Sequence, residues 1–379
     1  MNAIITTNVL SVNRLVLGNF RNYEHLSLNL QPCPVVITGS NGSGKTNILE
    51  ALSLFAPGKG LRGVKLSEAD RITTSGTYPW AISAAINSSG LITNIGTGRD
   101  PTTPENKRLV KIDGEKIKSQ AELAMVFSVM WLTPMMDGIF IGASVDRRKF
   151  LDRLVYNFDP EHASRVYSYE YCMRERAKLL QSGGDKHWLS VLESKMSEKS
   201  VAIAAARIET IQIIQSSINQ SKTDFPKANI GVEGRVEQLL EANKTALQTE
   251  EDLRKIFFDS RYKDQESGRT NIGVHRSDFT VFHASKNMPA AACSTGEQKA
   301  LLLSIILAEA KAKAQWKSSV PVLLLDEVIA HLDELRRHSL FDEFLQLGAQ
   351  VWMSGTDANN FEYLKDKAQF FVVRDGCII

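Results

Sequence analysis

Short apolar and alternating runs dominate roughly the first 130 residues of the chain. Such runs occupy residues 14–17, 26–30 and 81–86, and turn-forming residues follow at 87–90 and 113–114. Successive side chains of a strand point to opposite faces, so this pattern is typical of strands in a partly antiparallel sheet. It predicts a β-rich first part of the molecule.

A helical pattern replaces it in the middle of the chain. Apolar positions recur at helical spacing in residues 144–156, 160–180 and 188–218, with breaks at 183–184 and at Pro226. Sustained heptads over several repeats are missing, so a long coiled coil is not expected. The pattern predicts an inserted, mostly helical lobe.

Strands return in the last third of the chain. Residues 279–282 are strand-like, a long helix is predicted over 295–314, and the apolar run 320–326 is typical of a fully buried parallel strand. Residues 350–353 and 370–373 repeat the strand pattern. The prediction is an α/β fold, with a mixed sheet, an antiparallel β layer and the helical insertion. The expected parts are residues 1–143, 144–265 and 266–379.

Between a β-branched apolar run and a helical stretch lies a match to the phosphate-loop pattern G-x-x-x-x-G-K-[ST]. Its residues are Gly39, Ser40, Asn41, Gly42, Ser43, Gly44, Lys45 and Thr46. Glycines let the backbone N–H groups face a phosphate, while Lys45 bridges the β- and γ-oxygens and Thr46 ligates Mg²⁺. A chance match is the alternative, and the flanking strand and helix argue against it. The loop predicts a nucleoside triphosphate as ligand.

Composition adds only a little about ligands and location. The 379 residues carry a net charge of +2, so any basic surface for nucleic acid must be local. The four cysteines, Cys33, Cys172, Cys293 and Cys377, show no metal-ligand spacing and favour a reducing compartment. Neither a signal segment nor an apolar run of about 18 residues is evident, so a cytoplasmic location is expected.

Two carboxylates follow the apolar run near residue 325. Asp326 is expected to help hold Mg²⁺, and Glu327 to orient or deprotonate an attacking water. They are the candidate catalytic pair. The alternative is that these acids simply begin a solvated loop.

A second candidate anion site opens the long helix predicted from residue 295. It consists of Ser294, Thr295, Gly296, Glu297 and Gln298. A helix N-terminus led by serine and glycine binds anions. The segment resembles the signature sequence of ABC-type ATPases, which implies a head-to-tail pair with two ATP molecules at its interface. The alternative is that these residues form an ordinary helix cap, and a cap could also be part of an ATPase signature.

The spacing of these motifs distinguishes among ABC-type ATPases. The gap from Thr46 to Ser294 is about 250 residues, longer than in transporter ATPases and without the coiled coil of chromosome-maintenance proteins. The order and spacing of the motifs resemble the RecF family of bacterial DNA repair proteins. The matching segments are residues 17–23, 39–51, 146–152, 273–278 and 323–340.

The chain departs from the family pattern in three places. Residues 134–137 lack the usual acid after proline, Glu327 stands where aspartate is common, and His331 stands where glutamate is common. Asp333 matches the D-loop aspartate, which the resemblance places near the dimer interface. Thr356 follows the strand at 350–353, where ABC-type enzymes place a switch residue, and is the candidate for that role.

Several basic residues are further candidates. His275 and Arg276 are candidate phosphate sensors or structural residues, and Arg147, Arg148 and Lys149 are candidate DNA contacts or a salt-bridged helix start. Two groups are candidate phosphate contacts or solvated faces. They are Lys107, Arg108, Lys111, Lys116 and Lys118, and Arg165, Arg174, Arg176 and Lys178.

The resemblance implies an ATP-dependent DNA-binding protein of recombinational repair and replication. It implies that ATP and Mg²⁺ drive dimerisation, that slow hydrolysis acts as a switch, and that the protein binds duplex DNA near single-strand gaps. It further implies partnership with RecR and RecO type mediators in loading recombinase. The alternatives are a transporter motor, a stand-alone nucleotidase, or a chromosome-tethering protein.

Overall fold

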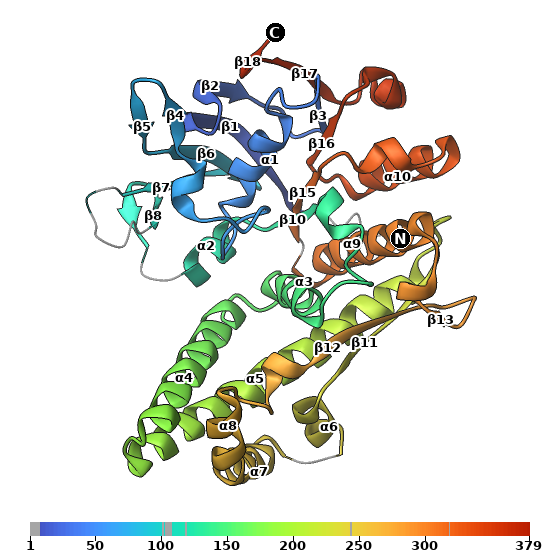
Figure 1. Cartoon of the computed structure of the whole chain (residues 1–379). Coiled ribbons are helices and arrows are strands. Elements are labelled where there is room, and N and C mark those ends of the chain that lie inside the picture. The colour runs from blue at the N-terminus through green and yellow to red at the C-terminus, as the bar shows by residue number, and fades with distance from the viewer. Residues whose placement is uncertain (1–7, 101, 103–107, 118–119, 243–244, 318) are drawn as a thin grey trace. The chain divides into compact units, whose positions relative to one another are not determined.

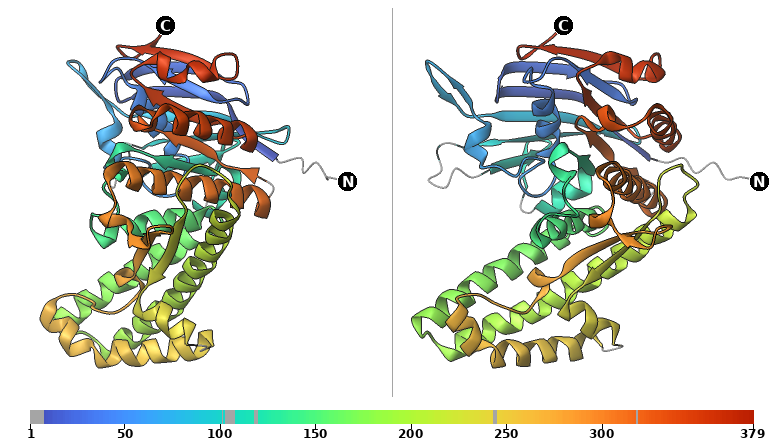
Figure 2. Two further views of the ribbon diagram at one scale, coloured as in Figure 1. Left: turned by 90° about the vertical axis from the view of Figure 1, so that its right-hand side faces the viewer. Right: turned by 45° about the vertical axis from the view of Figure 1, so that its right-hand side comes forward.

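The computed structural model describes residues 8–100, 102, 108–117, 120–242, 245–317 and 319–379. The chain forms two compact units, each of which is shown in Figure 1 and Figure 2. The first unit is Met1–Asp137, Gln220–Phe225 and Thr295–Ile379, and the second is Gly138–Asn219 and Pro226–Ser294. None of the described helices is both long and apolar enough to cross a bilayer.

An extended, mostly antiparallel sheet forms one layer of the first unit. Its described strands are β14 (Ser319–Val320), β1 (Asn8–Phe20), β6 (Ala81–Ser88), β7 (Leu91–Arg99), β8 (Arg108–Ile112) and β9 (Glu115–Lys116), in this order, with β2 (Tyr23–Asn29) also paired to β1. Only β14 runs parallel to its neighbour. A separate hairpin consists of β4 (Arg71–Thr73) and β5 (Gly76–Tyr78).

A parallel sheet forms the second layer of this unit. Its described strands are β10 (Val129–Leu132), β15 (Val322–Leu325), β16 (Val351–Gly355), β3 (Val35–Thr38), β17 (Gln369–Arg374) and β18 (Cys377–Ile378), in this order, with β18 antiparallel at the edge. Every residue of β3, β10, β15 and β16 is buried. Burial on both faces explains why these strands read as continuous apolar runs.

Helix α1 (Lys45–Ser53) lies between the two sheets. It contacts β16 and β10 of the parallel sheet and β1 of the antiparallel sheet. Leu49 and Leu52 of the helix share one buried core with Leu15 and Ile37. Because α1 is fixed on both sides, the loop before it is held in place at the end of β3.

The remaining segments of this unit are η1 (Leu66–Ala69), α2 (Gln120–Val126), η2 (Pro134–Met136), α9 (Thr295–Lys317), η5 (Val328–His331), α10 (Glu334–Leu347) and η6 (Ala358–Leu364).

The second unit is mostly helical. Its segments are α3 (Ser144–Tyr156), α4 (His162–Ser182), α5 (Lys186–Gln220), α6 (Arg235–Glu241), α7 (Ala246–Asp259), α8 (Arg261–Ser267), η3 (Val274–Arg276) and η4 (Ala290–Ala292), with strands β11 (Ala228–Glu233), β12 (Asp278–His283) and β13 (Met288–Pro289). Tyr169, Met196, Leu253, Phe257 and Val274 belong to its core. The α/β architecture and the helical insertion predicted from the sequence are confirmed.

The end of the second unit differs from the boundary expected at residue 265. The unit continues to Ser294, because β12 pairs with β11 along its whole length and β13 pairs with β12. The sequence predicts the strand at residues 279–282, but local pattern does not show that its pairing partner is β11 of the second unit. The helix predicted over 295–314 extends to Lys317.

Candidate nucleotide-binding site

The phosphate loop joins the C-terminal end of β3 to the first turn of α1. Gly39 has a φ of +152°, and a Cβ there would lie 2.3 Å from the carbonyl oxygen of Val373. Gly44 has a φ of +118°, and a Cβ there would lie 2.6 Å from Nδ2 of Asn22 and 2.7 Å from Oη of Tyr23. Both positions therefore need glycine for backbone conformation and for space.

Lys45 is folded back over the loop. Its Nζ donates hydrogen bonds to the carbonyl oxygens of Gly39 at 2.8 Å and Ser40 at 2.9 Å. Burial lowers the pKa of the Lys45 ammonium, and the nearby carboxylates of Glu327 and Asp326 oppose that shift. The cation at the centre of the loop suits a ligand that carries several negative charges, and the two acids beside it suit a metal ion bound together with that ligand.

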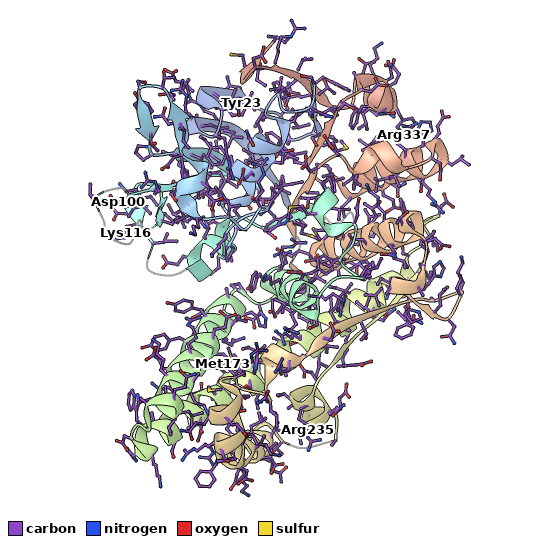
Figure 3. All side chains as sticks on the ribbon, viewed as in Figure 1. Tyr23, Asp100, Lys116, Met173, Arg235 and Arg337 are labelled. Carbon is purple, nitrogen blue, oxygen red and sulfur yellow. The ribbon has the colours of Figure 1, made fainter. Side chains whose placement is uncertain are left out.

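Two side chains from the turn between β1 and β2 support the loop from outside. Asn22 Nδ2 donates to the carbonyl of Ser43 at 3.0 Å, and its Oδ1 accepts from Asn47 at 2.7 Å. Tyr23, labelled in Figure 3, donates from Oη to the carbonyl of Gly44 at 3.1 Å. The sequence reasoning did not identify these loop supports. A polar and an aromatic residue directly after a long strand are the only local signal for them.

The candidate catalytic carboxylates follow β15, two strands away from β3. The Thr46 hydroxyl donates to Asp326 at 2.9 Å from Oδ1 and 3.1 Å from Oδ2. Asp326 is buried, and its backbone N–H bonds to the carbonyl of Leu132 at 2.9 Å. Parallel strands end at the same edge of a sheet, so residues that are 280 positions apart meet here.

Ser354 connects both carboxylate residues. Its fully buried hydroxyl donates to Asp326 Oδ1 at 2.6 Å and accepts from the backbone N–H of Glu327 at 2.9 Å. Glu327 has a left-handed backbone with a φ of +52°, which is uncommon for a residue other than glycine. The Ser354 bond therefore stabilises the backbone turn that carries Glu327. The sequence reasoning did not single out this serine, although it lies on the neighbouring parallel strand.

The donor set at this edge fits a magnesium nucleotide. Mg²⁺ prefers oxygen ligands and is usually bound by one or two carboxylates together with substrate phosphates. Thr46 and Asp326 supply a hydroxyl and a carboxylate within hydrogen-bond distance of each other. Ser43, inside the loop, has a buried hydroxyl without a hydrogen-bond partner in the described part of the chain. These atoms are the ones that would hold the metal and a phosphate.

The predicted signature segment has an exposed start and a buried continuation. Ser294, Thr295 and Gly296 are exposed, and a Cβ added at Gly296 would meet open space. Glu297 is half-buried, whereas Gln298 is buried. The start of the first turn of α9 is thus exposed at the surface.

An ion pair between buried Lys299 and half-buried Asp137 fixes the second turn of α9. Lys299 is 4% exposed, and its Nζ lies 3.6 Å from Oδ2 of Asp137. Burial lowers the pKa of the Lys299 ammonium, and Asp137 opposes this shift. Asp137 belongs to the segment that lacks the family's acid after proline. Its carboxylate lies three residues after that proline and contacts the signature helix instead.

The structure places the remaining nucleotide-site candidates as follows. Asp333 is exposed and caps α10, because its side chain accepts from the backbone N–H of Arg336 at 2.8 Å. Thr356 is exposed and directly follows β16, and none of the hydrogen bonds of the described residues joins it to Asp326 or Glu327. The side chain of His331 lies outside the described residues.

Several basic candidates serve the structure of their own unit. Arg147 binds Asp278 through two hydrogen bonds of 2.8 and 2.7 Å, and Arg148 donates to the carbonyl of Ser277 at 2.6 Å. This is the salt-bridged helix start considered from the sequence. Lys149 is exposed beside Asp146.

His275 is held as a neutral imidazole. Nε2 lies 2.8 Å from the carbonyl of Thr270, which can only accept, so Nε2 carries the proton and Nδ1 accepts from the Tyr169 hydroxyl at 2.7 Å. Burial lowers the pKa of His275 to about 4. A half-buried, neutral ring whose two nitrogens are both hydrogen-bonded within the second unit is not a phosphate sensor, which favours its structural role.

Two arginines expected among the phosphate contacts are buried in structural networks. Arg176 is 0% exposed and binds Glu193 at 2.9 Å and Asp264 at 2.7 Å. Arg108 donates to carbonyl oxygens at the end of α1 and of Gly58, and burial lowers its pKa to about 10. Lys111 and Lys116 are exposed, and Lys116 is labelled in Figure 3. Lys107 and Lys118 lie outside the described residues.

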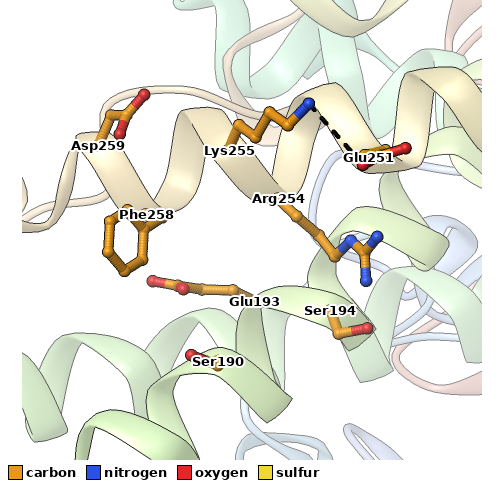
Figure 4. A pocket seen from close by; sticks show the side chains of 8 residues that line it. All are labelled: Ser190, Glu193, Ser194, Glu251, Arg254, Lys255, Phe258 and Asp259. Atoms are coloured by element: carbon orange, nitrogen blue, oxygen red, sulfur yellow. Dashed lines mark ion pairs between the residues drawn. The ribbon is translucent and has the colours of Figure 1, made fainter.

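A groove of about 530 Å³ lies between α5 and α7 of the second unit. Figure 4 shows Arg254 and Phe258 directed from α7 toward α5. The carboxylate of Glu193 in its floor already binds Arg176 and Arg261. The groove is lined by Ser190, Glu193, Ser194, Glu251, Arg254, Lys255, Phe258 and Asp259. With three acids and two bases, this lining carries no excess of positive charge, so it is not a nucleotide site of the kind built at Gly39–Thr46.

The two-layered sheet fold, together with this arrangement of loop, carboxylates and signature turn, defines an ABC-type ATPase head. Residues 11–378 match the family model described as RecF/RecN/SMC N terminal domain. The chain is 44% identical to DNA replication and repair protein RecF of Agrobacterium fabrum, over 98% of this chain and 99% of that one. It is 42% identical to the RecF protein of Rickettsia typhi, over 94% and 98% of the two chains. The chain belongs to the RecF family.

A solved structure shows that the fold is shared over nearly the whole chain. It is the recombination mediator protein RecF-ATPrS in RecFOR pathway, which covers 98% of both chains with a TM-score of 0.84. Its sequence identity to this chain is 22%. The predicted family, which rested on five short segments, is confirmed.

Proposed function

We propose that this chain is an ATP-dependent DNA-binding protein of recombinational repair and replication. The name shared by the curated relatives supports this role, and the geometry at the end of β3 and β15 supports ATP as the ligand. The observation that carries the proposal is the combination of a phosphate loop already joined to Asp326 with an exposed signature turn at the start of α9.

The residues of the loop have separate tasks in binding ATP. The N–H groups of residues 39–46 and the N-terminus of α1 hold the phosphates, and Lys45 neutralises the β- and γ-oxygens. Thr46 and Asp326 would hold Mg²⁺, which would supply charge neutralisation at the phosphates. Glu327 orients the attacking water and accepts its proton. Ser354 keeps Asp326 and the backbone of Glu327 in place.

ATP binding and dimerisation are coupled in this proposal. The signature turn at residues 294–298 of one copy caps the γ-phosphate held by the phosphate loop of a second copy, and Asp333 lies near the same interface. A site that needs both copies is complete only after assembly, so hydrolysis is slow and resets the dimer. ATP then acts as a timer of the assembled state.

The proposed partner is duplex DNA beside single-strand gaps. The dimer bound there helps RecR and RecO type mediators to load recombinase, and the protein works in the cytoplasm. With a net charge of +2 for the whole chain, the DNA contact must come from local basic surfaces.

A DNA-binding titration tests this function. Fluorescence anisotropy of a labelled duplex is measured with ATP, without nucleotide, and with the Lys45→Ala variant. We expect ATP to raise the affinity of the unmodified protein only, and log K to fall linearly with log salt between about 50 and 200 mM. Binding that ignores ATP and salt would contradict the proposal.

A further inference from the structure

Helix α4 (His162–Ser182) of the second unit has two different faces. Its buried residues are His162, Tyr169, Cys172, Arg176 and Leu180. At about 100° per residue, Tyr167, Tyr171, Arg174 and Lys178 fall within roughly 60° of one another, directly opposite Arg176. We call these four residues the outer stripe of α4. Figure 1 shows α4 at the margin of the second unit.

Both tyrosines of the outer stripe are exposed. Tyr167 is 67% exposed and Tyr171 is 51% exposed, and neither hydroxyl has a hydrogen-bond partner among the described residues. Tyr169, on the inner face, bonds to His275 and is buried. The inner tyrosine is therefore structural, whereas the fold does not need the rings of the two outer ones.

The two cations of the stripe remain available. The side chains of Arg174 and Lys178 are 53% and 72% exposed, and they lie 3.8 and 2.8 Å from Glu170 and Glu175 of the same helix. Exposed ion pairs of this kind contribute little to stability, so each cation can leave its carboxylate readily and bind a stronger anion. Burial raises the pKa of the Cys172 thiol on the inner side of α4, and Lys195 and Lys199 of α5, which lie close enough to oppose that shift, add positive charge beside this helix.

We propose that the outer stripe of α4 binds single-stranded DNA, with bases stacked on Tyr167 and Tyr171 and phosphates held by Arg174 and Lys178. This inference rests on the proposed DNA-binding function and names the strand that the second unit contacts. Flat rings beside cations are the usual composition of surfaces that bind single strands, because unpaired bases expose their faces. A duplex keeps its bases stacked on each other and offers none to the tyrosines.

The stripe fits a nucleic acid better than a protein partner. Protein interfaces are enriched in Tyr and Arg but depleted in Lys and Glu, and their cores are well packed and mainly apolar. The stripe contains no aliphatic side chain and continues with Ser164 and Gln181 along the same line. Its rings are four residues apart, which corresponds to a rise of about 6 Å along the helix.

Binding of three DNA probes to the full-length chain with ATP tests the site. The probes are oligodeoxythymidine, a blunt duplex and a gapped duplex. The variant Tyr167→Ala/Tyr171→Ala is compared with the ring-retaining Tyr167→Phe/Tyr171→Phe, and with Tyr262→Ala as a control for losing an exposed tyrosine, 76% exposed, from the same unit. We expect the alanine variant to bind oligodeoxythymidine at least about tenfold more weakly, and the phenylalanine variant and the control to bind it normally.

The other probes separate this site from the general function. Affinity for the blunt duplex and the melting temperature should not change in the alanine variant. Equal oligodeoxythymidine binding by the alanine and unmodified proteins would overturn the site, as would an equal loss on all three probes or a loss confined to binding of a mediator protein. If the unmodified protein binds none of the probes, the DNA-binding function itself fails, and this site fails with it.

Discussion

At the residue scale, Gly44 of the phosphate loop combines a requirement for a left-handed backbone with a requirement for space. Gly44 has a φ of +118° and also has no room for a Cβ, because Asn22 and Tyr23 lie within 2.7 Å of that position. Gly183, at the end of α4, has a φ of +66° but open space around it. The two positions therefore form a matched pair for separating backbone strain from lost space.

We expect Gly44→Ala to weaken ATP binding by roughly tenfold or more, because the loop must move away from Asn22 and Tyr23. Gly183→Ala should lower the free energy of unfolding by about 1 kcal/mol and leave ATP affinity unchanged. Isothermal titration with ATP and urea unfolding measure the two effects. Equal ATP affinity in both variants would show that the supports of the loop are dispensable.

Ser354 offers a second test at this scale. Ser354→Ala leaves the backbone N–H of Glu327 without its partner, which should lower the free energy of unfolding by about 1–3 kcal/mol. We expect the rate of ATP hydrolysis to fall about tenfold, a change of about 1.4 kcal/mol in the barrier, with a smaller effect on ATP binding. Single-turnover hydrolysis measures this. Ser304→Ala, at another buried serine on α9, is the control and should hydrolyse ATP normally.

At the scale of elements, the sequence predicted what depends on local pattern. The strand before Gly39, the helix after it and the buried run before Asp326 each carry their own signal in spacing and side-chain type. The residues that support the site carry no such signal. Asn22, Ser354 and Asp137 reach the site through tertiary contacts, and their sequence neighbours give no indication of those contacts.

The arginines of α4 show the same limit. A run of basic residues on a helix is typical of a solvated or phosphate-binding face. The sequence pattern alone did not show which face of α4 is buried, and so which of these residues lie in the core. Arg176 points into the core, where Glu193 and Asp264 need its charge, whereas Arg174 points outward. Burial, set by the packing of α5 and α8, decides their roles.

We expect Arg176→Met to lower the free energy of unfolding by about 3–5 kcal/mol, because it leaves the buried carboxylate of Asp264 without its cation and leaves Glu193 with Arg261 alone. Arg174→Met, on the exposed face, should change it by less than about 0.5 kcal/mol. Urea unfolding followed by circular dichroism measures both. Similar stability of the two variants would mean that the buried network does not hold α4, α5 and α8 together.

At the scale of the whole molecule, our proposal divides the nucleotide site between two copies of the chain and so gives a role to both helix starts, that of α1 and that of α9. The phosphate loop, Thr46 and Asp326 are joined by hydrogen bonds within the first unit. The signature turn at residues 294–296 stays exposed at the start of α9. In our proposal a second copy completes the site, so the ATP-bound dimer is the working state.

Mixing two inactive variants tests this claim most directly. Lys45→Ala disables the phosphate loop, and Ser294→Arg disables the signature turn, so each homodimer lacks both of its sites. A mixed dimer contains one intact site, made from the loop of the Ser294→Arg copy and the signature of the Lys45→Ala copy. We predict that an equimolar mixture regains roughly a quarter of the unmodified ATPase activity, because half of the dimers are mixed and each has one of two sites. No recovery on mixing, or full activity of Ser294→Arg alone, would contradict the shared site.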